Sequence, residues 1–473
     1  MTKIEELIEL IIGRTNINLR EFSMDVGPYV RGIIPKKHFW KFYAFYGMTQ
    51  HHPLSFSFQR SGLAGSFFLG YCDIDRSVIY KTDVRGDELK LEGDTIDVGD
   101  IQITLQKDEK IYIKDSFLIK NLVHNYSHDP EDLGEFGIRN TISMHYANIH
   151  GSPLRGCFLG PYATVDLTTA HDCVIGEFAY VQVGELNHEL VGPGEVWIRS
   201  GEDFDFVYQF PTEILPKYIQ MNKEEQPSGL LIDFVEQRQG DFWEVFGRVQ
   251  FGQARLMLES AAVSRYAVIK GDVHIGENVL IAQRAYIEDS TMGKGANAQE
   301  NCYIIDSHLM GNNVTAHGGK VIHATLGEDG FVGFNAFLRG SEKSPLTVGK
   351  NCVVMPHTIM DLEEPLTIPD AHFVWGYIRN QKDFEENSLS MEDFIKVEGD
   401  LAMGNMHFSG SGRAFVKAFA QRIDHILEAN GAYFQAGEQS GHAQMGRNIS
   451  YNLIEPYPEG DMRGMYPTIS ITP

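Results

Sequence analysis

Cysteine is scarce in this sequence. Five cysteines occur in 473 residues, too few and too scattered for a disulfide framework. Three of them, Cys173, Cys302 and Cys352, stand where the repeat described below calls for a small buried residue. We therefore expect them to serve packing in a reducing compartment, which predicts a cytoplasmic protein.

Basic residues and long apolar runs are also in short supply. Lys and Arg number 40 against 64 Asp and Glu, which gives a formal net charge of −24. This charge repels the phosphates of nucleic acids and of anionic lipid surfaces. No run reaches the roughly 18 apolar residues that a membrane-spanning helix needs. The composition therefore predicts no nucleic-acid partner and no membrane partner, and it leaves a small molecule as the expected substrate.

What the sequence does contain is a regular repeat. An aliphatic residue followed by glycine recurs at Ile275-Gly276, Met292-Gly293, Met310-Gly311, Leu326-Gly327 and Val348-Gly349. The steps between these pairs are 17, 18, 16 and 22 residues, and each divides into shorter stretches of about six that open with Ile, Val, Leu or Ala. An inward side chain at every sixth position predicts a coil with three sides, and stacked coils bury one another's faces. The sequence therefore predicts a parallel β-helix.

A shorter block of the same repeat precedes the main one. The pairs Leu159-Gly160, Ile175-Gly176 and Val191-Gly192 are spaced by 16 and 16 residues. Between about 201 and 253 the repeat stops, and the pattern there predicts helices interrupted at prolines. We therefore expect an N-terminal helix and aromatic-rich lid at 1–60, a first β-helical or strand block at 61–200, a helical insertion at 201–255, the main β-helix at 256–380, and C-terminal helices with an arm at 381–473.

The hexapeptide pattern resembles that of the hexapeptide-repeat family, which includes acyltransferases and γ-class carbonic anhydrases. The left-handed sense of the helix is implied by this resemblance, because parallel strands otherwise prefer right-handed crossovers. The expected fold class is mainly β, a left-handed parallel β-helix with an inserted helical segment and a helical C-terminal extension. The resemblance also implies a homotrimer, because the flat faces of related prisms pack around a threefold axis.

The first candidate site lies in the stretch TAHDCVIGEFAYVQVG, residues 169–184. It resembles the motif of hexapeptide sugar acyltransferases, and its core AHDCVIG resembles acyltransferases of lipid A synthesis. Such enzymes use a neutral imidazole to take a proton from the attacking hydroxyl or amine, and a carboxylate to hold the tautomer. The resemblance implies His171 as the base, Asp172 as its partner, Tyr180 as a donor-binding group, and acyl-CoA as the donor.

A second candidate site lies in residues 297–340, which are similar to γ-class carbonic anhydrases. Those enzymes bind zinc between subunits and use it to activate water. The resemblance implies Gln299 as a hydrogen-bonding glutamine, and His317 and His323 as paired ligands of zinc or iron. Gln283, Gln299 and His317 are spaced by 16 and 18 residues. This spacing predicts that they stack along one edge, at about 4.8 Å per coil.

The γ-class ligand set is incomplete in this sequence. The position of the first ligand falls on Ile305, and isoleucine cannot bind a metal, so Asp306 or His308 is the expected replacement. Another pair, His124 and His128, has a spacing found in some zinc ligand pairs. The acidic, proline-containing residues after it are more typical of a polar loop.

Three functions remain open at this point. The first is an acyltransferase that uses acyl-CoA and a sugar nucleotide or a small amine or hydroxyl acceptor. The second is a metal-dependent hydratase or hydrolase of the γ-carbonic-anhydrase type with a divergent site. The third is a non-catalytic trimeric scaffold. Analogy with other proteins of the expected fold favours the transferase.

Overall fold

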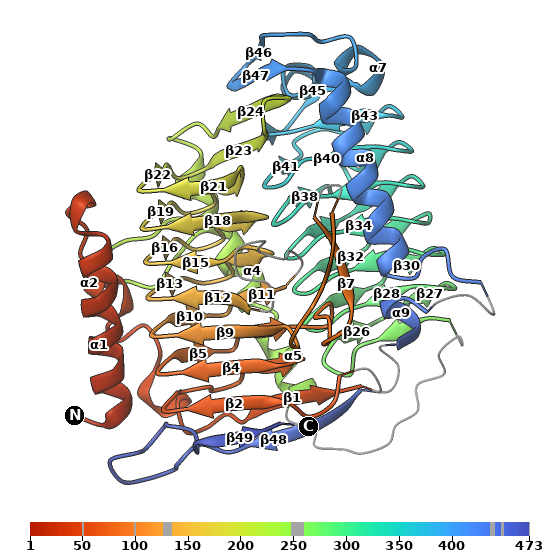
Figure 1. The fold of residues 1–473 in the computed structure, drawn as a ribbon. Coiled ribbons are helices and arrows are strands. Elements are labelled where there is room, and N and C mark those ends of the chain that lie inside the picture. Colours follow the sequence, from red (N-terminus) through yellow and green to blue (C-terminus); the bar gives the residue numbers. More distant parts are fainter. Residues whose placement is uncertain are drawn as a thin grey trace. The chain divides into compact units, whose positions relative to one another are not determined.

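The computed structural model describes residues 1–49, 52–98, 101–125, 135–246, 260–435, 440–445 and 449–472. The chain divides into two compact units, which are described separately. The first comprises Met1–Glu195, Leu215–Leu230 and Ile449–Pro473, and the second comprises Val196–Ile214 and Leu231–Asn448. Figure 1 shows stacks of short strands in both.

The first unit is a parallel β-helix whose described strands form three sheets, here called A, B and C. The strands of sheet A that belong to this unit are β48 (Ser450–Ile454), β1 (Ala44–Met48), β3 (Phe67–Leu69), β6 (Asp83–Arg85), β11 (Leu122–His124), β14 (Asn148–His150), β17 (Thr164–Asp166) and β20 (Tyr180–Gln182). Sheet B consists of β49 (Ile469–Ile471), β2 (Phe56–Gln59), β4 (Cys72–Asp75), β9 (Lys110–Lys114), β12 (Glu135–Arg139), β15 (Leu154–Arg155), β18 (Thr168–His171) and β21 (Gly184–Asn187). Sheet C consists of β5 (Val78–Tyr80), β10 (Phe117–Ile119), β13 (Ile142–Ser143), β16 (Phe158–Leu159), β19 (Val174–Ile175) and β22 (Leu190–Val191).

Each coil of this unit passes once through the three sheets, so equivalent residues of successive coils lie side by side. Thr164 pairs with Tyr180 in sheet A, and Ala170 pairs with Leu186 in sheet B. The terminal strands β48 and β49 are antiparallel to their neighbours β1 and β2. Between β6 and β9 the chain leaves the coil and forms the hairpin β7 (Thr95–Val98) and β8 (Ile101–Thr104).

Helix α1 (Lys3–Asn18) covers sheet C of the first unit (Figure 1). Its apolar side, with Ile4, Leu7 and Ile11, joins one core with Phe117 and other side chains of sheet C. The remaining short helices of this unit are η1 (Arg20–Phe22), α2 (Gly27–Val30), η2 (Lys36–His38) and α3 (Leu215–Tyr218).

The second unit contains another parallel β-helix, with sheets here called D, E and F. Sheet D consists of β25 (Ala262–Val263), β28 (Leu280–Ile281), β31 (Asn297–Ala298), β34 (Val314–Thr315), β37 (Phe331–Val332), β40 (Val353–Val354), β43 (His372–Val374) and β45 (Ser388–Ser390). Sheet E consists of β26 (Val268–Lys270), β29 (Tyr286–Glu288), β32 (Tyr303–Ile305), β35 (Lys320–Ile322), β38 (Phe337–Arg339), β41 (Ile359–Asp361) and β44 (Tyr377–Ile378). Sheet F consists of β27 (His274–Ile275), β30 (Thr291–Met292), β33 (His308–Leu309), β36 (Ala324–Leu326), β39 (Leu346–Val348) and β42 (Leu366–Ile368).

Helices flank this second β-helix. They are α4 (Leu230–Glu236), α5 (Gln239–Phe246), α6 (Gln381–Glu386), α7 (Met391–Phe394), α8 (Gly412–Ala429) and α9 (His442–Met445). The helical insertion packs by its aromatic residues, since Phe234 contacts Tyr303 and Phe246 stacks on Tyr266. Helix α8 packs through Phe415 onto Phe373 of sheet D.

The segment expected as a helical insertion, 201–255, also contains a strand. β24 (Phe204–Gln209) follows β23 (Glu195–Ser200) and pairs with β47 (Met406–Gly410), which pairs in turn with β46 (Leu401–Met403). The alternating pattern Phe204, Phe206 and Tyr208 explains the strand, because these three side chains are buried and the residues between them are partly exposed. Residues 247–259 lie outside the described residues.

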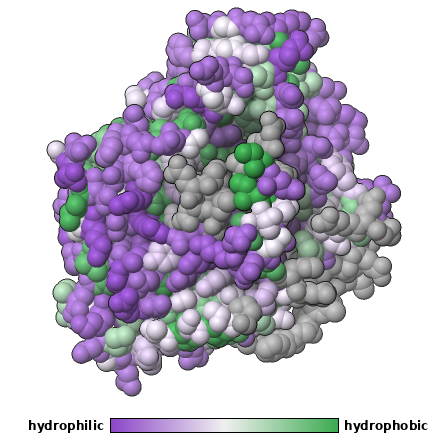
Figure 2. All heavy atoms as spheres, viewed as in Figure 1, coloured by the Kyte–Doolittle hydropathy of each residue, from purple (hydrophilic) through white to green (hydrophobic). Residues whose placement is uncertain are grey.

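The inward residues of the coils are apolar, and much of the surface in view is hydrophilic (Figure 2). All five cysteines are buried and free, as expected for the packing role predicted for Cys173, Cys302 and Cys352. Among the described helices, none is both long enough and apolar enough to cross a membrane.

Candidate functional site

His171 ends strand β18 on the outer side of sheet B. It is partly exposed, and it stands in register with Arg155 of β15 and Asn187 of β21. Its backbone carbonyl accepts hydrogen bonds from the amide of His188 at 3.0 Å and from the thiol of Cys173 at 3.1 Å. The backbone that carries the imidazole is therefore held firmly, while the ring itself can be reached by solvent.

Asp172 occupies the corner after β18, in a left-handed conformation with φ of 54°. Its Oδ1 accepts a hydrogen bond from Nδ2 of Asn18 at 2.5 Å, and its Oδ2 lies 3.9 Å from Nε2 of His188. Elsewhere along this corner, Thr15 donates to the carbonyl of Asn140 at 3.1 Å, so α1 runs beside it. Among the described residues, no hydrogen bond joins Asp172 to the ring of its neighbour, and the carboxylate anchors the end of α1.

Tyr180 lies on another sheet from His171. Its hydroxyl donates to the Asp166 carboxylate and is 2.9 Å from Oε1 of Gln182. The structure therefore brings Tyr180 into a polar row on sheet A and does not bring it beside the proposed base.

The sequence motifs did not predict this polar row. Arg85, His124, His150 and Asp166 pair in register on four neighbouring strands, β6, β11, β14 and β17. Nδ1 of His150 lies 2.8 Å from Oδ1 of Asp166. Asp166 is 0% exposed and the two histidines are each 6% exposed. A carboxylate on Nδ1 fixes the proton there, so the lone pair of His150 is on Nε2.

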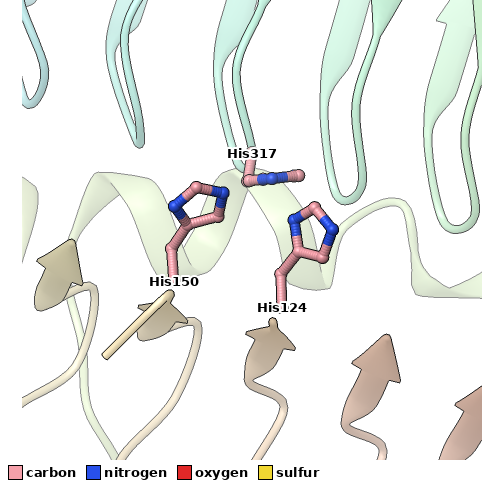
Figure 3. Close-up of side chains that lie close together, drawn as sticks. All are labelled: His124, His150 and His317. Carbon is pink, nitrogen blue, oxygen red and sulfur yellow. The ribbon is translucent and has the colours of Figure 1, made fainter. Parts of the chain in front are cut away.

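His124 extends the row towards an inserted loop. Its ring centroid is 5.1 Å from that of His150, and Figure 3 shows the two imidazoles side by side at their strand ends. Nε2 of His124 lies 3.5 Å from Oδ1 of Asp87 and 3.7 Å from Oε1 of Glu88, both on the loop between β6 and β9. Although 23% of the Glu88 side chain is exposed, desolvation and the charge of Asp87 raise the pKa of Glu88 to about 8. His128 lies outside the described residues.

In the second unit, His317 follows β34 and is 2% exposed. Its Nδ1 lies 3.0 Å from Oε2 of Glu300, and its ring packs against Phe334. Because Ala298 pairs with Thr315, the residue one coil before His317 is Glu300, and the partly exposed Gln299 is displaced from the expected column by one position. Gln299 therefore lies outside the predicted stack, since the coil at this point is one position shorter than the interval from Gln299 to His317, whereas Gln283 and His317 are in register with Glu300.

The structure does not bring His317 and His323 together. His317 precedes strand β35 and His323 follows it, so the two rings stand at different corners of the coil. Nε2 of His323 lies 3.4 Å from Oδ2 of Asp306, at an open position, and His308 is exposed on β33.

Lys320 is a buried ionisable group of the same coil. It is 1% exposed, and its Nζ donates to the carbonyl of Gly318 at 2.6 Å. Burial lowers the pKa of Lys320 to about 7, so the amine loses its proton in the neutral pH range.

Comparison with known proteins agrees with this architecture. The sequence profile called "Hexapeptide repeat including loop" matches residues 101–223. The crystal structure of a "putative acetyltransferase" from Desulfovibrio desulfuricans G20, at 2.28 Å resolution, is 54% identical, covers 100% of this chain and 99% of its own, and has a TM-score of 0.94. The chain belongs to the hexapeptide-repeat family, and its fold is the left-handed parallel β-helix, as predicted. A search of curated proteins gives no match.

Two other solved structures are much less similar. The UDP-N-acetylglucosamine acyltransferase from Campylobacter jejuni is 11% identical, covering 69% of this chain and 96% of its own, with a TM-score of 0.18. An acetyltransferase, also termed putative, from Bacillus cereus is 9% identical, covering 34% of this chain and 92% of its own, with a TM-score of 0.11. Neither value supports a statement about this chain.

Proposed function

We propose that this protein is an acyltransferase that moves an acyl group from acyl-CoA to a hydroxyl or amine of a small acceptor, such as a nucleotide sugar. The observation that carries the proposal is the full-length similarity, 54% identity, to a protein described as an acetyltransferase. We place the site on the outer side of sheet B, where Arg155, His171 and Asn187 are in register on neighbouring strands. His171 is partly exposed, and its backbone is held by hydrogen bonds.

The reaction needs one proton acceptor. The neutral imidazole of His171 takes the proton from the acceptor as its oxygen or nitrogen attacks the thioester carbonyl. The new C–O or C–N bond forms, the C–S bond breaks, and the imidazolium returns the proton to the leaving CoA thiolate. Arg155, one coil away and exposed, supplies a guanidinium suited to a phosphate of the donor or of the acceptor. Asp172 takes no part in this step, because Asn18 holds its carboxylate.

The experiment is a thiol-release assay with acetyl-CoA and a panel of amino sugars, nucleotide-linked sugars and small amines. Because all five cysteines are buried, the protein adds little thiol background. We expect His171→Asn to lower kcat by roughly 10²- to 10⁴-fold. His274→Asn is the matched control, since this histidine of the second unit has a side chain 71% exposed.

Two results would contradict this proposal. One is a His171→Asn enzyme with wild-type kcat, which would show that His171 is not the general base. The other is a wild-type protein that releases no thiol with any acceptor and whose unfolding temperature acyl-CoA leaves unchanged, which would favour a non-catalytic scaffold. The homotrimer and the cytoplasmic location remain predictions, and sedimentation equilibrium of the full chain tests the first.

A further inference from the structure

The row on sheet A has the chemistry of a metal site, and acyl transfer at His171 makes no use of it. We infer that His124 and His150 bind a divalent transition-metal ion, with Asp166 as the carboxylate that orients His150. All three residues belong to the first unit.

The two imidazoles are placed as neighbouring ligands. They come from adjacent strands in register, and a ring nitrogen of one lies within 4.8 Å of a ring nitrogen of the other. Two nitrogens bound to one tetrahedral zinc ion at about 2.0–2.1 Å lie roughly 3.4 Å apart. A closing movement of at most about 1.4 Å, shared between the two rings, is therefore enough to bring both nitrogens onto one ion. Figure 3 shows both rings with a nitrogen turned towards the space between them.

Asp166 supports His150 as the outer carboxylate of a metal site does. Its Oδ1 lies 2.8 Å from Nδ1 of His150, so the opposite ring nitrogen, Nε2, carries the lone pair. Its second oxygen accepts the Tyr180 hydroxyl, which holds the carboxylate in place. An imidazole oriented by a carboxylate in this way is the usual arrangement around a bound metal.

Two carboxyl groups lie on the other side of the His124 ring. Oδ1 of Asp87 is 3.5 Å and Oε1 of Glu88 is 3.7 Å from Nε2 of His124. They can orient this ring as Asp166 orients His150, which leaves Nδ1 of His124, the nitrogen turned towards His150, for the ion. Imidazole ligands suit zinc and other transition metals better than magnesium or calcium, which prefer oxygen ligands.

The test uses the full-length protein, stripped with a chelator and reloaded with Zn²⁺ or Co²⁺. The metal content is measured by mass spectrometry after gel filtration, and the bound Co²⁺ by its visible absorption. We expect about one ion per chain in the wild type, and its loss in His124→Asn and in His150→Asn. His188→Asn, a histidine of the same unit with a side chain 53% exposed, is the matched control and should keep the ion.

Asp166→Asn separates a metal site from a purely structural row. Because Asp166 orients a ligand without binding the ion, this variant should bind Co²⁺ roughly 10- to 100-fold more weakly and shift its absorption. Circular dichroism shows whether each variant is folded. If His150→Asn does not fold, the Co²⁺ affinity of Asp166→Asn is the test of the metal site. The inference is overturned if the folded wild type retains no ion, or if the three variants bind Co²⁺ as tightly as the control. Neither outcome depends on whether His171 transfers acyl groups.

Discussion

Replacing Asp172 by alanine should loosen helix α1 and leave catalysis largely intact. The change removes the bond between Nδ2 of Asn18 and Oδ1 of Asp172, which is 2.5 Å long. A hydrogen bond to a charged group contributes about 1.5–3 kcal/mol. Because 24% of the Asp172 side chain is exposed, water replaces part of the bond, and we expect a loss of about 1–2 kcal/mol. The apolar contacts of α1 remain.

Hydrogen exchange of the α1 amides, residues 3–18, measures this loss as faster local opening. Asn18→Ala should have a similar effect, and the double variant should be little worse than either single one, with a coupling energy of about 1 kcal/mol. In the thiol-release assay, Asp172→Ala should keep most of the wild-type kcat.

The opposite pattern would refute the reasoning. If Asp172→Ala lowers kcat as much as His171→Asn does, while exchange in α1 is unchanged, then the carboxylate orients the base. The two substitutions are informative together because the residues are adjacent in sequence but have different expected effects. His171→Asn should lower kcat, whereas Asp172→Ala should speed hydrogen exchange in α1.

Two further predictions concern buried bases. The pKa of Lys320 is about 7 in the folded chain and about 10.4 unfolded, so between these values the unfolded chain binds more protons. Relative to Lys320→Met, the wild type should gain about 2–3 kcal/mol of unfolding free energy from pH 7 to 9, measured by urea titration. Burial, followed by the charge of Lys120, lowers the pKa of His145 well below its usual value, so the wild type should lose stability relative to His145→Leu below about pH 6.5, by up to about 1.4 kcal/mol per pH unit. Equal pH slopes in wild type and variant would contradict either prediction.

The coils could be predicted from the sequence because their signal is local. Val165 and Val181 are inward residues of successive coils, and the interval between them recurs from Leu159 to Ile175 and from Ile175 to Val191. Each coil buries the same kind of side chain, so a period of about six marks the fold wherever it occurs. The presence of two separate β-helices was partly visible too, in the break of the repeat after Val191.

The polar row on sheet A could not be found in the same way. His150 and Asp166 are one coil apart, a spacing that a search for ionisable residues at the coil period would have noticed. The interval from His124 to His150 is longer than a regular coil, because additional residues follow β11 before the coil resumes. A repeat of constant length, applied to the sequence, therefore does not place His124 beside His150. A similar error of one position led to Gln299 instead of Glu300 beside His317.

The cost of burial itself argues that the row on sheet A is functional. Asp166 and its partner His150 are 0% and 6% exposed, and a buried carboxylate with its polar partner is commonly less stable than apolar side chains of similar volume, by about 1–4 kcal/mol. If the row serves a ligand, the triple variant His150→Leu, Asp166→Val and Tyr180→Phe should fold and unfold at an equal or higher urea concentration than the wild type, while binding no Co²⁺. If the row holds the sheet together, the same variant should be several kcal/mol less stable. A marked loss of stability in this variant would therefore show that the histidine–carboxylate ladder is structural, since the three replacements remove every polar group of the His150–Asp166–Tyr180 chain at once.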